Sequence, residues 1–134
     1  AVAFQGRIGC GDINTGNFIW SKDFSSYTGT AQSQEFVFAA DEKSHVVAYR
    51  ADDGVEVWRN ETMTWRDVGE PLSVGRLLVM GDKQGYLHFL EQSSGKPVAR
   101  IRVDSSAISA APIVASGMLI VQTRSGSLAA YRPN

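Results

Sequence analysis

The sequence predicts an all-β protein, a β-propeller made of four-stranded antiparallel blades, and three observations lead to this fold class. The first is a repeat, in which four stretches of similar sequence align: residues 7–12, 45–50, 86–91 and 127–132. The second is the period of about 40 residues, because a glycine follows each of the first three stretches, at Gly16, Gly54 and Gly95. The third is that no segment places apolar residues at helical spacing over three turns. A period of about 40 residues with only strand-like segments is typical of propeller blades.

The third repeat illustrates the elements of one blade. Four strands are expected there: residues 67–74, 77–81, 86–91 and 96–103. The second of these is apolar almost throughout, as expected for a strand that is buried on both faces. The turn that precedes the third strand ends in Gly85, which can adopt a positive φ angle. Pro71 lies near the middle of the first strand, and Pro112 has the same place in the fourth repeat.

The other repeats follow this template with some departures. The second repeat has Ser44 where the third has a glycine, so we expect a different type of turn there. The first repeat begins within its second strand and the last ends after its third strand, which gives about three and a half blades. The chain therefore reads as a fragment or processed C-terminal piece of a larger ring. The expected division is a partial blade at residues 1–24, blades at 25–61 and 62–104, and a partial blade at 105–134.

The composition limits the classes of protein to consider. The chain has 134 residues, of which 43% are hydrophobic and 20% charged, as in a folded domain. The net charge is −1 and no basic stripe occurs, which argues against nucleic acid or an anionic membrane surface as a partner. The apolar runs are far shorter than the roughly 20 residues that a membrane-spanning helix needs. Cys10 is the single cysteine, so no internal disulfide is expected.

The most conspicuous side chains have structural interpretations. Trp20 and Trp58 each follow a turn glycine by four residues, on an expected outer strand, where a large ring can cover the seam between neighbouring blades. The third repeat has Ala99 at this position, so its seam must be filled differently. Neither His45 nor His88 has a Cys, His or carboxylate at metal-ligand spacing, and no serine lies in a nucleophile motif. We therefore predict no catalytic residue, no metal site and no cofactor.

Several motifs resemble known families. One resemblance is to the quinoprotein-like (PQQ-type) propeller repeat, at residues 6–20, which read Gly-Arg-Ile-Gly-Cys-Gly-Asp-Ile-Asn-Thr-Gly-Asn-Phe-Ile-Trp. More specific stretches are Leu-Val-Met-Gly-Asp-Lys-Gln-Gly-Tyr-Leu-His at residues 78–88, Val-Asp-Ser-Ser at 103–106 and Ala-Pro-Ile-Val-Ala at 111–115. These resemble the C-terminal part of the BamB family, the lipoprotein subunit of the outer-membrane β-barrel assembly machinery of Gram-negative bacteria.

The resemblance implies a fold, a location and partners. It implies an eight-bladed propeller that is not an enzyme, held at the periplasmic face of the outer membrane by an N-terminal lipid that lies outside this chain. The implied partners are the periplasmic (POTRA) domains of the barrel-forming subunit, and unfolded outer-membrane proteins could bind by pairing with exposed strand edges. The principal docking residues of the family lie upstream of Ala1, so none of them is carried onto this sequence.

What the resemblance does carry over is a class of loop, the connection from one blade to the next. These connections are expected at residues 25–28, 61–67 and 104–107. From their position and chemistry, Tyr27, Trp65, Arg66 and Asp104 are the hypothetical partner-binding residues, since Trp and Arg are frequent in interface hot spots. The residues expected to be structural are Gly16, Trp20, Gly54, Trp58, Gly85, Gly95 and Gly126.

Two other functions remain open at the level of sequence. One is a quinone-dependent dehydrogenase of the same superfamily, which needs calcium, a catalytic aspartate and, in several members, a vicinal cysteine pair. This chain has one cysteine and no acidic cluster in a shared site. The other is a general propeller module that binds an unrelated protein.

Overall fold

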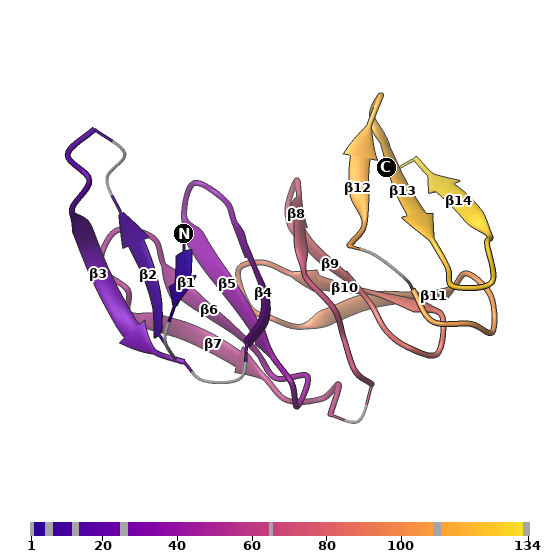
Figure 1. The fold of residues 1–134 in the computed structure, drawn as a ribbon, viewed down its shortest axis with the longest axis horizontal. Helices are drawn as coiled ribbons and strands as arrows, with labels where there is room; N and C mark the ends of the chain where they lie inside the picture. Colours follow the sequence, from indigo (N-terminus) through magenta and orange to yellow (C-terminus); the bar gives the residue numbers. More distant parts are fainter. Residues whose placement is uncertain are drawn as a thin grey trace.

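The computed structural model describes residues 2–4, 7–11, 14–24, 27–64, 66–108 and 111–132. These residues form fourteen strands in four antiparallel sheets, which follow one another across Figure 1 from indigo to yellow. Within the described ranges no helix occurs, and so none is long and apolar enough to cross a membrane. The all-β fold class and the antiparallel blades predicted from the sequence are confirmed.

The strands are short and are joined mainly by tight turns. The first sheet contains β1 (Val2–Phe4), β2 (Arg7–Gly11) and β3 (Phe18–Asp23). The second contains β4 (Tyr27–Gln32), β5 (Phe36–Asp41), β6 (Val46–Arg50) and β7 (Glu56–Asn60). The third contains β8 (Leu72–Val74), β9 (Leu77–Gly81), β10 (Tyr86–Glu91) and β11 (Pro97–Arg102). The fourth contains β12 (Ile113–Ala115), β13 (Met118–Gln122) and β14 (Leu128–Tyr131).

Two details differ from the expectations. The first strand of the third sheet begins after Pro71 rather than at residue 67, because proline has no amide hydrogen to donate to the ladder. The prediction of a different turn at Ser44 is wrong. Ser44 has a φ of 65°, in the same left-handed region as Gly85 at 90°. The two turns also close with the same backbone bond, from Ser44 to Asp41 and from Gly85 to Asp82.

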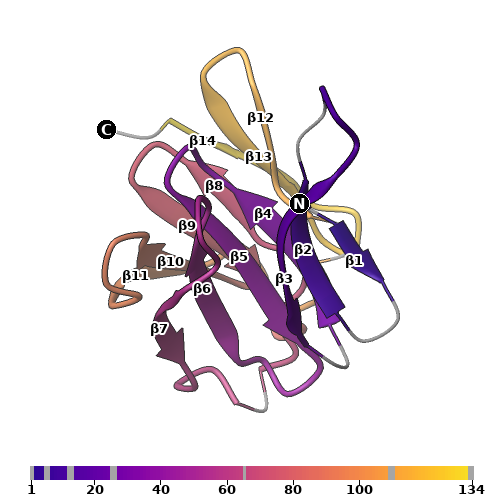
Figure 2. The ribbon, with the colours of Figure 1, turned by 90° about the vertical axis from the view of Figure 1, so that its left-hand side faces the viewer.

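Three apolar clusters form the core, one at each junction between neighbouring sheets. The middle strands are buried on both faces, so successive residues of β5 serve different junctions. Val37 and Ala39 pack with Ile8 and Trp20 against the first sheet, whereas Phe38 packs towards the third. Between the third and fourth sheets the buried residues are Val79, Leu87, Leu119 and Val121. Figure 2, seen from the side of β1–β3, shows the following sheets behind the first.

Two tryptophans close the seams between sheets. Trp20, on β3, donates its indole N–H to the carbonyl of Ala51 at 2.8 Å, in the turn of the second sheet. Trp58, on β7, donates to the carbonyl of Gln92 at 2.7 Å, in the corresponding turn of the third sheet. A Cβ atom at Gly95 would overlap the ring of Trp58, as one at Gly54 would overlap that of Trp20. The glycines therefore provide the space that the rings occupy.

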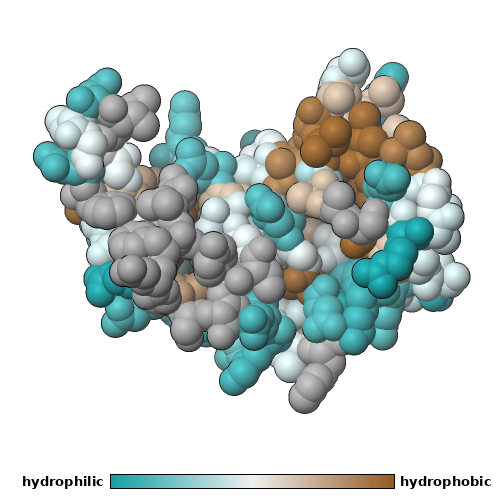
Figure 3. All heavy atoms as spheres, viewed as in Figure 1, coloured by the Kyte–Doolittle hydropathy of each residue, from teal (hydrophilic) through white to brown (hydrophobic). Residues whose placement is uncertain are grey.

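The fourth sheet presents apolar surface to the outside. Figure 3 shows this surface over β12, β13 and β14. Its exposed large side chains include Ile113 and Val114, about half accessible, and Leu128, at 72%. Exposed apolar patches of this kind are usually covered in the functional state of a protein.

Candidate functional site

The described connections between sheets lie against the turns between the second and third strands of the sheets. We call these connections and turns the corner edge; its described parts are residues 61–64, 66–67 and 104–107 and the turns at 41–45, 82–86 and 123–127. Each of the two connections is bonded to the turn of the following sheet. The amide of Lys83 donates to the carbonyl of Arg66 at 3.3 Å, and the amide of Arg124 donates to that of Ala107 at 2.7 Å. The corner edge is thus a surface of loops fixed by backbone hydrogen bonds.

The turns of the corner edge are built by a side chain at their first position. The carboxylate of Asp41 accepts bonds from the amides of Lys43 and His45 at 2.9 and 3.0 Å. Asp82 accepts bonds from the corresponding amides of the third sheet at 2.8 and 3.0 Å. In the fourth sheet Thr123 has this position, and its hydroxyl accepts a bond from the amide of Ser127 at 3.2 Å. The same cap therefore closes a turn with serine at position 44 and a turn with glycine at position 85.

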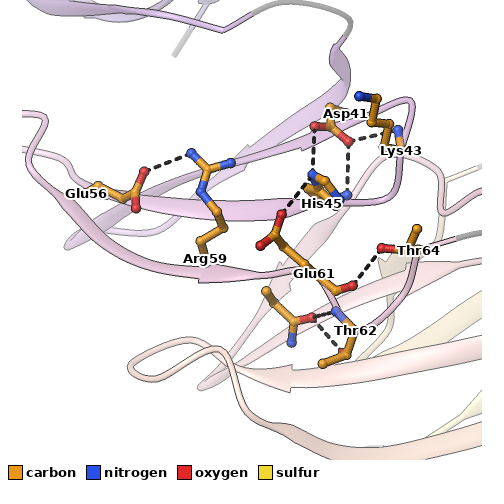
Figure 4. Close-up of polar contacts among 9 residues, drawn as sticks. Asp41, Lys43, His45, Glu56, Arg59, Glu61, Thr62 and Thr64 are labelled. Atoms are coloured by element: carbon orange, nitrogen blue, oxygen red, sulfur yellow. Dashed lines mark hydrogen bonds and ion pairs between the residues drawn. The ribbon is translucent and has the colours of Figure 1, made fainter.

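In the second sheet two basic side chains near the turn lie beside carboxylates. Figure 4 shows His45 between two carboxylates, with its Nδ1 atom 3.6 Å from Oδ2 of Asp41 and 3.3 Å from Oε2 of Glu61. Nearby, Arg59 donates to the carboxylate of Glu56 at 3.0 Å. His45 and Arg59 thus each have an acidic neighbour.

In the third sheet a buried pair lies behind the turn. His88 and Asp82 are both almost fully buried, and Nε2 of His88 lies 2.7 Å from Oδ2 of Asp82. Burial alone would raise the pKa of Asp82, but the hydrogen bonds from His88 and from the amides of Tyr86 and Gln84 outweigh it and lower that pKa. The charged carboxylate is therefore a fixed part of this corner.

Three arginines surround the aromatic ring in front of that pair. The guanidinium carbons of Arg66, Arg100 and Arg102 lie 5.4, 4.6 and 5.2 Å from the centre of the Tyr86 ring, within cation–π distance. Arg66 comes from the connection between sheets and contacts the side-chain oxygen of Gln84. Arg102 lies directly opposite Tyr86 in the pairing of β10 with β11. We call these four residues the arginine cluster.

Asp104 holds the next connection in place. One of its carboxylate oxygens accepts bonds from the amide and hydroxyl of Ser106, both at 2.7 Å. The other accepts bonds from the hydroxyls of Thr123 and Ser125 at 2.7 and 2.9 Å. The bonds from Thr123 and Ser106 are the main reason that the pKa of Asp104 lies far below its ordinary value. This carboxylate ties the connection to the turn of the fourth sheet.

The structure places the four hypothetical partner-binding residues differently. Arg66 and Asp104 both lie on the corner edge, in successive connections. Tyr27 lies at the start of β4, where its backbone pairs with that of Asp41, and its side chain lies outside the described part. Trp65 lies outside the described residues. The side chain of Arg66 contacts Gln84 and the ring of Tyr86, whereas the carboxylate of Asp104 is engaged by its own connection and the following turn.

Sequence reasoning missed Tyr86, Arg100 and Arg102. These residues are on strands, whereas the predicted partner-binding residues lie in the connections between sheets. The signal was available in the aligned repeats, since Tyr86 occupies the column of His45 and Arg100 that of Arg59. The pairing of both histidines with the turn aspartates was missed as well. In the described part of the chain, no group of three or more His, Cys, Asp or Glu residues could hold a metal ion.

Comparisons with known proteins assign the chain to a family. The family model described as outer membrane protein assembly factor BamB matches residues 1–60 and 42–133. The outer membrane protein assembly factor BamB of Burkholderia pseudomallei is 45% identical over 133 residues, which are 99% of this chain and 35% of that protein. The chain thus spans about a third of the length of such curated relatives.

Solved structures agree on the fold. The crystal structure of BamB from Moraxella catarrhalis matches with a TM-score of 0.85 and 22% identity, over 95% of this chain and 38% of that one. A quinohemoprotein alcohol dehydrogenase from Pseudomonas putida matches with a TM-score of 0.65 and 19% identity, over 80% of this chain and 19% of that one. Both resemblances, at these identities, concern the fold. The sequence match over nearly all its residues settles the family, and the chain belongs to that of the outer membrane protein assembly factor BamB.

Proposed function

We propose that this chain is part of a non-catalytic scaffold subunit of the outer-membrane protein assembly machinery. The observation that carries the proposal is the alignment of nearly the whole chain with proteins named outer membrane protein assembly factor. In this proposal the full protein is lipid-anchored at the periplasmic face of the outer membrane. It binds the periplasmic (POTRA) domains of the barrel-forming subunit and aids the folding and insertion of barrel proteins.

The proposal also concerns the architecture of the full protein. The chain spans about a third of its relatives' length, and the face of the fourth sheet that points away from the third sheet exposes Ile113 and Leu128. A further blade packed against that face would bury these side chains, as the sheets bury the apolar residues of their neighbours here. We place the four sheets in an eight-bladed ring, within which this face is an internal junction.

The corner edge is the proposed contact surface within this part of the ring. Its loops are fixed by backbone bonds to the following turns, so a partner would meet a preorganised surface with little ordering cost. Arg66 has a partly exposed side chain and is the proposed contact there. Asp104 has both its oxygens engaged within the chain, so we assign it the role of holding the connection in shape.

The test is a pull-down from solubilised outer membranes with the full-length protein as bait. Recovery of the barrel-forming subunit by the unaltered protein is the expected result. Arg66→Ala should reduce recovery several-fold, whereas Arg76→Ala, an exposed arginine in the β8–β9 turn, is the matched control and should leave it unchanged. Failure of the folded, unaltered protein to recover that subunit would contradict the proposed function.

An enzymatic role is the rival proposal. It is suggested by the fold resemblance to a quinohemoprotein alcohol dehydrogenase. At 19% identity that resemblance concerns the fold alone. The direct test adds the quinone and calcium to the full-length protein and measures alcohol-dependent reduction of a dye. We expect no reduction above the background of the free quinone, and catalysed turnover would favour the dehydrogenase.

A further inference from the structure

We propose that the arginine cluster is the docking site for an acidic segment of a partner protein. This inference deepens the proposed function, because it assigns a partner chemistry to one part of the corner edge. The segment would present two or three carboxylates to the guanidinium groups of Arg66, Arg100 and Arg102. An adjoining apolar side chain of the same segment would enter the hollow beside them.

The first support is that the arginines converge from separate parts of the chain. Arg66 lies in a connection, while Arg100 and Arg102 project from the same face of β11, two residues apart. All three guanidinium carbons lie within 5.4 Å of the centre of the Tyr86 ring. Bringing like charges together costs free energy, which Tyr86 offsets only in part, and an anionic ligand would offset the remainder.

The second support is the lack of acidic partners for this charge. Arg7, Arg50 and Arg59 each lie within 3.6 Å of a carboxylate oxygen, whereas Arg76 and Arg124, which lie outside the arginine cluster, have no such partner among the described residues. Among the described residues no carboxylate lies within 4.0 Å of Arg100 or Arg102, and both side chains are exposed. The carboxylates nearest to the cluster, those of Asp67 and Asp82, already have partners within the chain.

The engagement of those acids leaves a net positive site. Asp82 is buried and bonded to His88, with Arg66 at 3.9 Å, and Asp67 pairs with Lys83 at 2.8 Å. Guanidinium groups present planar, paired N–H donors, and this geometry matches a carboxylate in a bidentate fashion. The site therefore selects carboxylates by shape as well as by charge.

The third support is a hollow that adjoins the cluster. It has a volume of about 340 Å³ and shares Arg66 and Arg100 with the cluster. Its apolar lining includes Met63, Leu90 and Pro97. A hollow with an apolar floor and a cationic rim suits a peptide that carries an apolar side chain next to its carboxylates.

The charge distribution favours a protein segment over a membrane or a nucleic acid. Binding to anionic lipid usually takes about four to eight clustered basic residues, and this site has three. The chain as a whole has a net charge of −1, so the cluster is a local feature rather than part of a basic face. An acidic segment of limited length matches this local charge.

The test compares two labelled peptides on the full-length protein. In one, Glu and Asp alternate with Leu and Phe; in the other, Gln and Asn replace the acidic residues. Fluorescence anisotropy should show the acidic peptide binding about tenfold more tightly than the neutral one. This difference in affinity should be smaller in high salt, because mobile ions screen exposed charges. Arg100→Gln combined with Arg102→Gln should weaken binding of the acidic peptide about tenfold.

Matched controls keep the result interpretable. Arg59→Gln alters the arginine that has the same place as Arg100 on the second sheet, and it should leave binding of the acidic peptide within about twofold of the unaltered protein. Arg100→Lys combined with Arg102→Lys keeps the charge but loses the planar donors, and it should bind with intermediate affinity. Because these side chains are exposed, unchanged thermal unfolding would show that the variants remain folded.

Each outcome has a defined meaning. Equal binding of the two peptides, or no loss in the double Gln variant, would overturn the inference. Binding of vesicles rich in phosphatidylglycerol through the same arginines, without binding of the acidic peptide, would overturn it in favour of a lipid surface.

The pull-down with the double Gln variant separates the inference from the proposed function. Recovery of the barrel-forming subunit by the unaltered protein, with peptide binding independent of the arginines, would reject the inference alone. Arginine-dependent peptide binding without recovery of that subunit would reject the proposed function alone.

Discussion

The corner of the second sheet and the corner of the third have the same backbone, yet they present different surfaces. In both, an aspartate caps the turn, and the residue after the turn lies at the first position of a buried strand or directly before it. In the second sheet that residue is His45, which lies between two carboxylates. In the third it is Tyr86, which lies among three arginines. The backbone repeat is thus independent of the chemistry that each corner offers.

This difference shows how a repeat can acquire a local function. The turn is determined by one capping carboxylate and one residue with positive φ, so the residue that follows it can change without altering the fold. The two sheets can therefore be compared position by position, and the following substitutions test that comparison.

The largest effect is expected at the seam. Trp58→Ala would give the second sheet the residue that the third has at Ala99, and it should lower the free energy of unfolding by about 4 kcal/mol. It removes a buried ring and the bond to Gln92. Ala99→Ser, at an exposed position, should cost less than about 0.5 kcal/mol. Urea denaturation of the full-length protein measures both, and equal losses would show that the ring does not hold the seam.

Substitutions of the two turn residues should differ almost as strongly in their cost to the free energy of unfolding. Gly85→Ser would give the third sheet the serine of the second, but its Cβ atom would overlap the carbonyl oxygen of Asp104. We expect a loss of about 3 kcal/mol, since backbone has to move. The reverse change, Ser44→Gly, removes an acceptor for the amide of Val68 and should cost about 1 kcal/mol. Thermal unfolding that ranks Ser44→Gly as the more damaging change would refute this account.

The next largest loss of stability is expected for substitutions of the capping aspartates. Asp82→Ala leaves His88 and two turn amides without their buried acceptor and should cost about 2.5 kcal/mol. Asp41→Ala removes the same two amide bonds where water can replace them, and it should cost about 1 kcal/mol. The comparison fails if denaturant midpoints fall equally for the two variants.

The connections should differ in their response to pH. The folded chain lowers the pKa of Asp104, so the charged carboxylate stabilises the fold. This contribution is complete above the unfolded value and is lost as the pH falls below about 4. The corresponding residue of the preceding connection is the buried Met63, which does not titrate.

Asp104→Asn should therefore lower the melting temperature at neutral pH and flatten its decline in acid. Melting temperatures measured from pH 7 down to pH 3 test this, with the exposed Glu42→Gln as control. A variant whose acid profile matches that of the unaltered protein would rule out this role for Asp104.

The smallest effect is expected at a surface ion pair. Glu56→Gln removes the acidic partner of Arg59 and should change the free energy of unfolding by only about 0.3 kcal/mol. It also leaves Arg59 unpaired, as Arg100 is, but without neighbouring arginines. We expect no gain in binding of the acidic peptide, and a gain would show that one unpaired arginine suffices.

The sequence predicted the arrangement of strands better than the surface. The period of the repeat and the apolar run at residues 77–81 were enough to predict antiparallel blades and strands buried on both faces. The turn at Ser44 was mispredicted because the prediction depended on the glycine, whereas Ser44 adopts the same left-handed φ in a turn that has the same aspartate cap. A prediction based on the glycine alone did not include the hydrogen bonds that the carboxylate of Asp41 accepts from the turn.

The arginine cluster could not be seen from motifs, because its members are far apart in the sequence. Arg66 meets Tyr86 only after the connection folds onto the turn, where Lys83 bonds to the carbonyl of Arg66. Arg102 could have been found, since antiparallel pairing of β10 with β11 sets it opposite Tyr86. Long-range contacts of the first kind require the folded chain.

The contact of each tryptophan with a glycine of the next sheet has a consequence for inheritance. At the seam of Trp58 and Gly95 two positions share one volume, so a change at one alters which residues the other can accept. A lineage that shortened the tryptophan could place asparagine at the glycine, since asparagine tolerates a positive φ, whereas a lineage that kept the ring could not. Substitutions at these two positions should therefore be correlated in evolution, although the positions belong to different repeats.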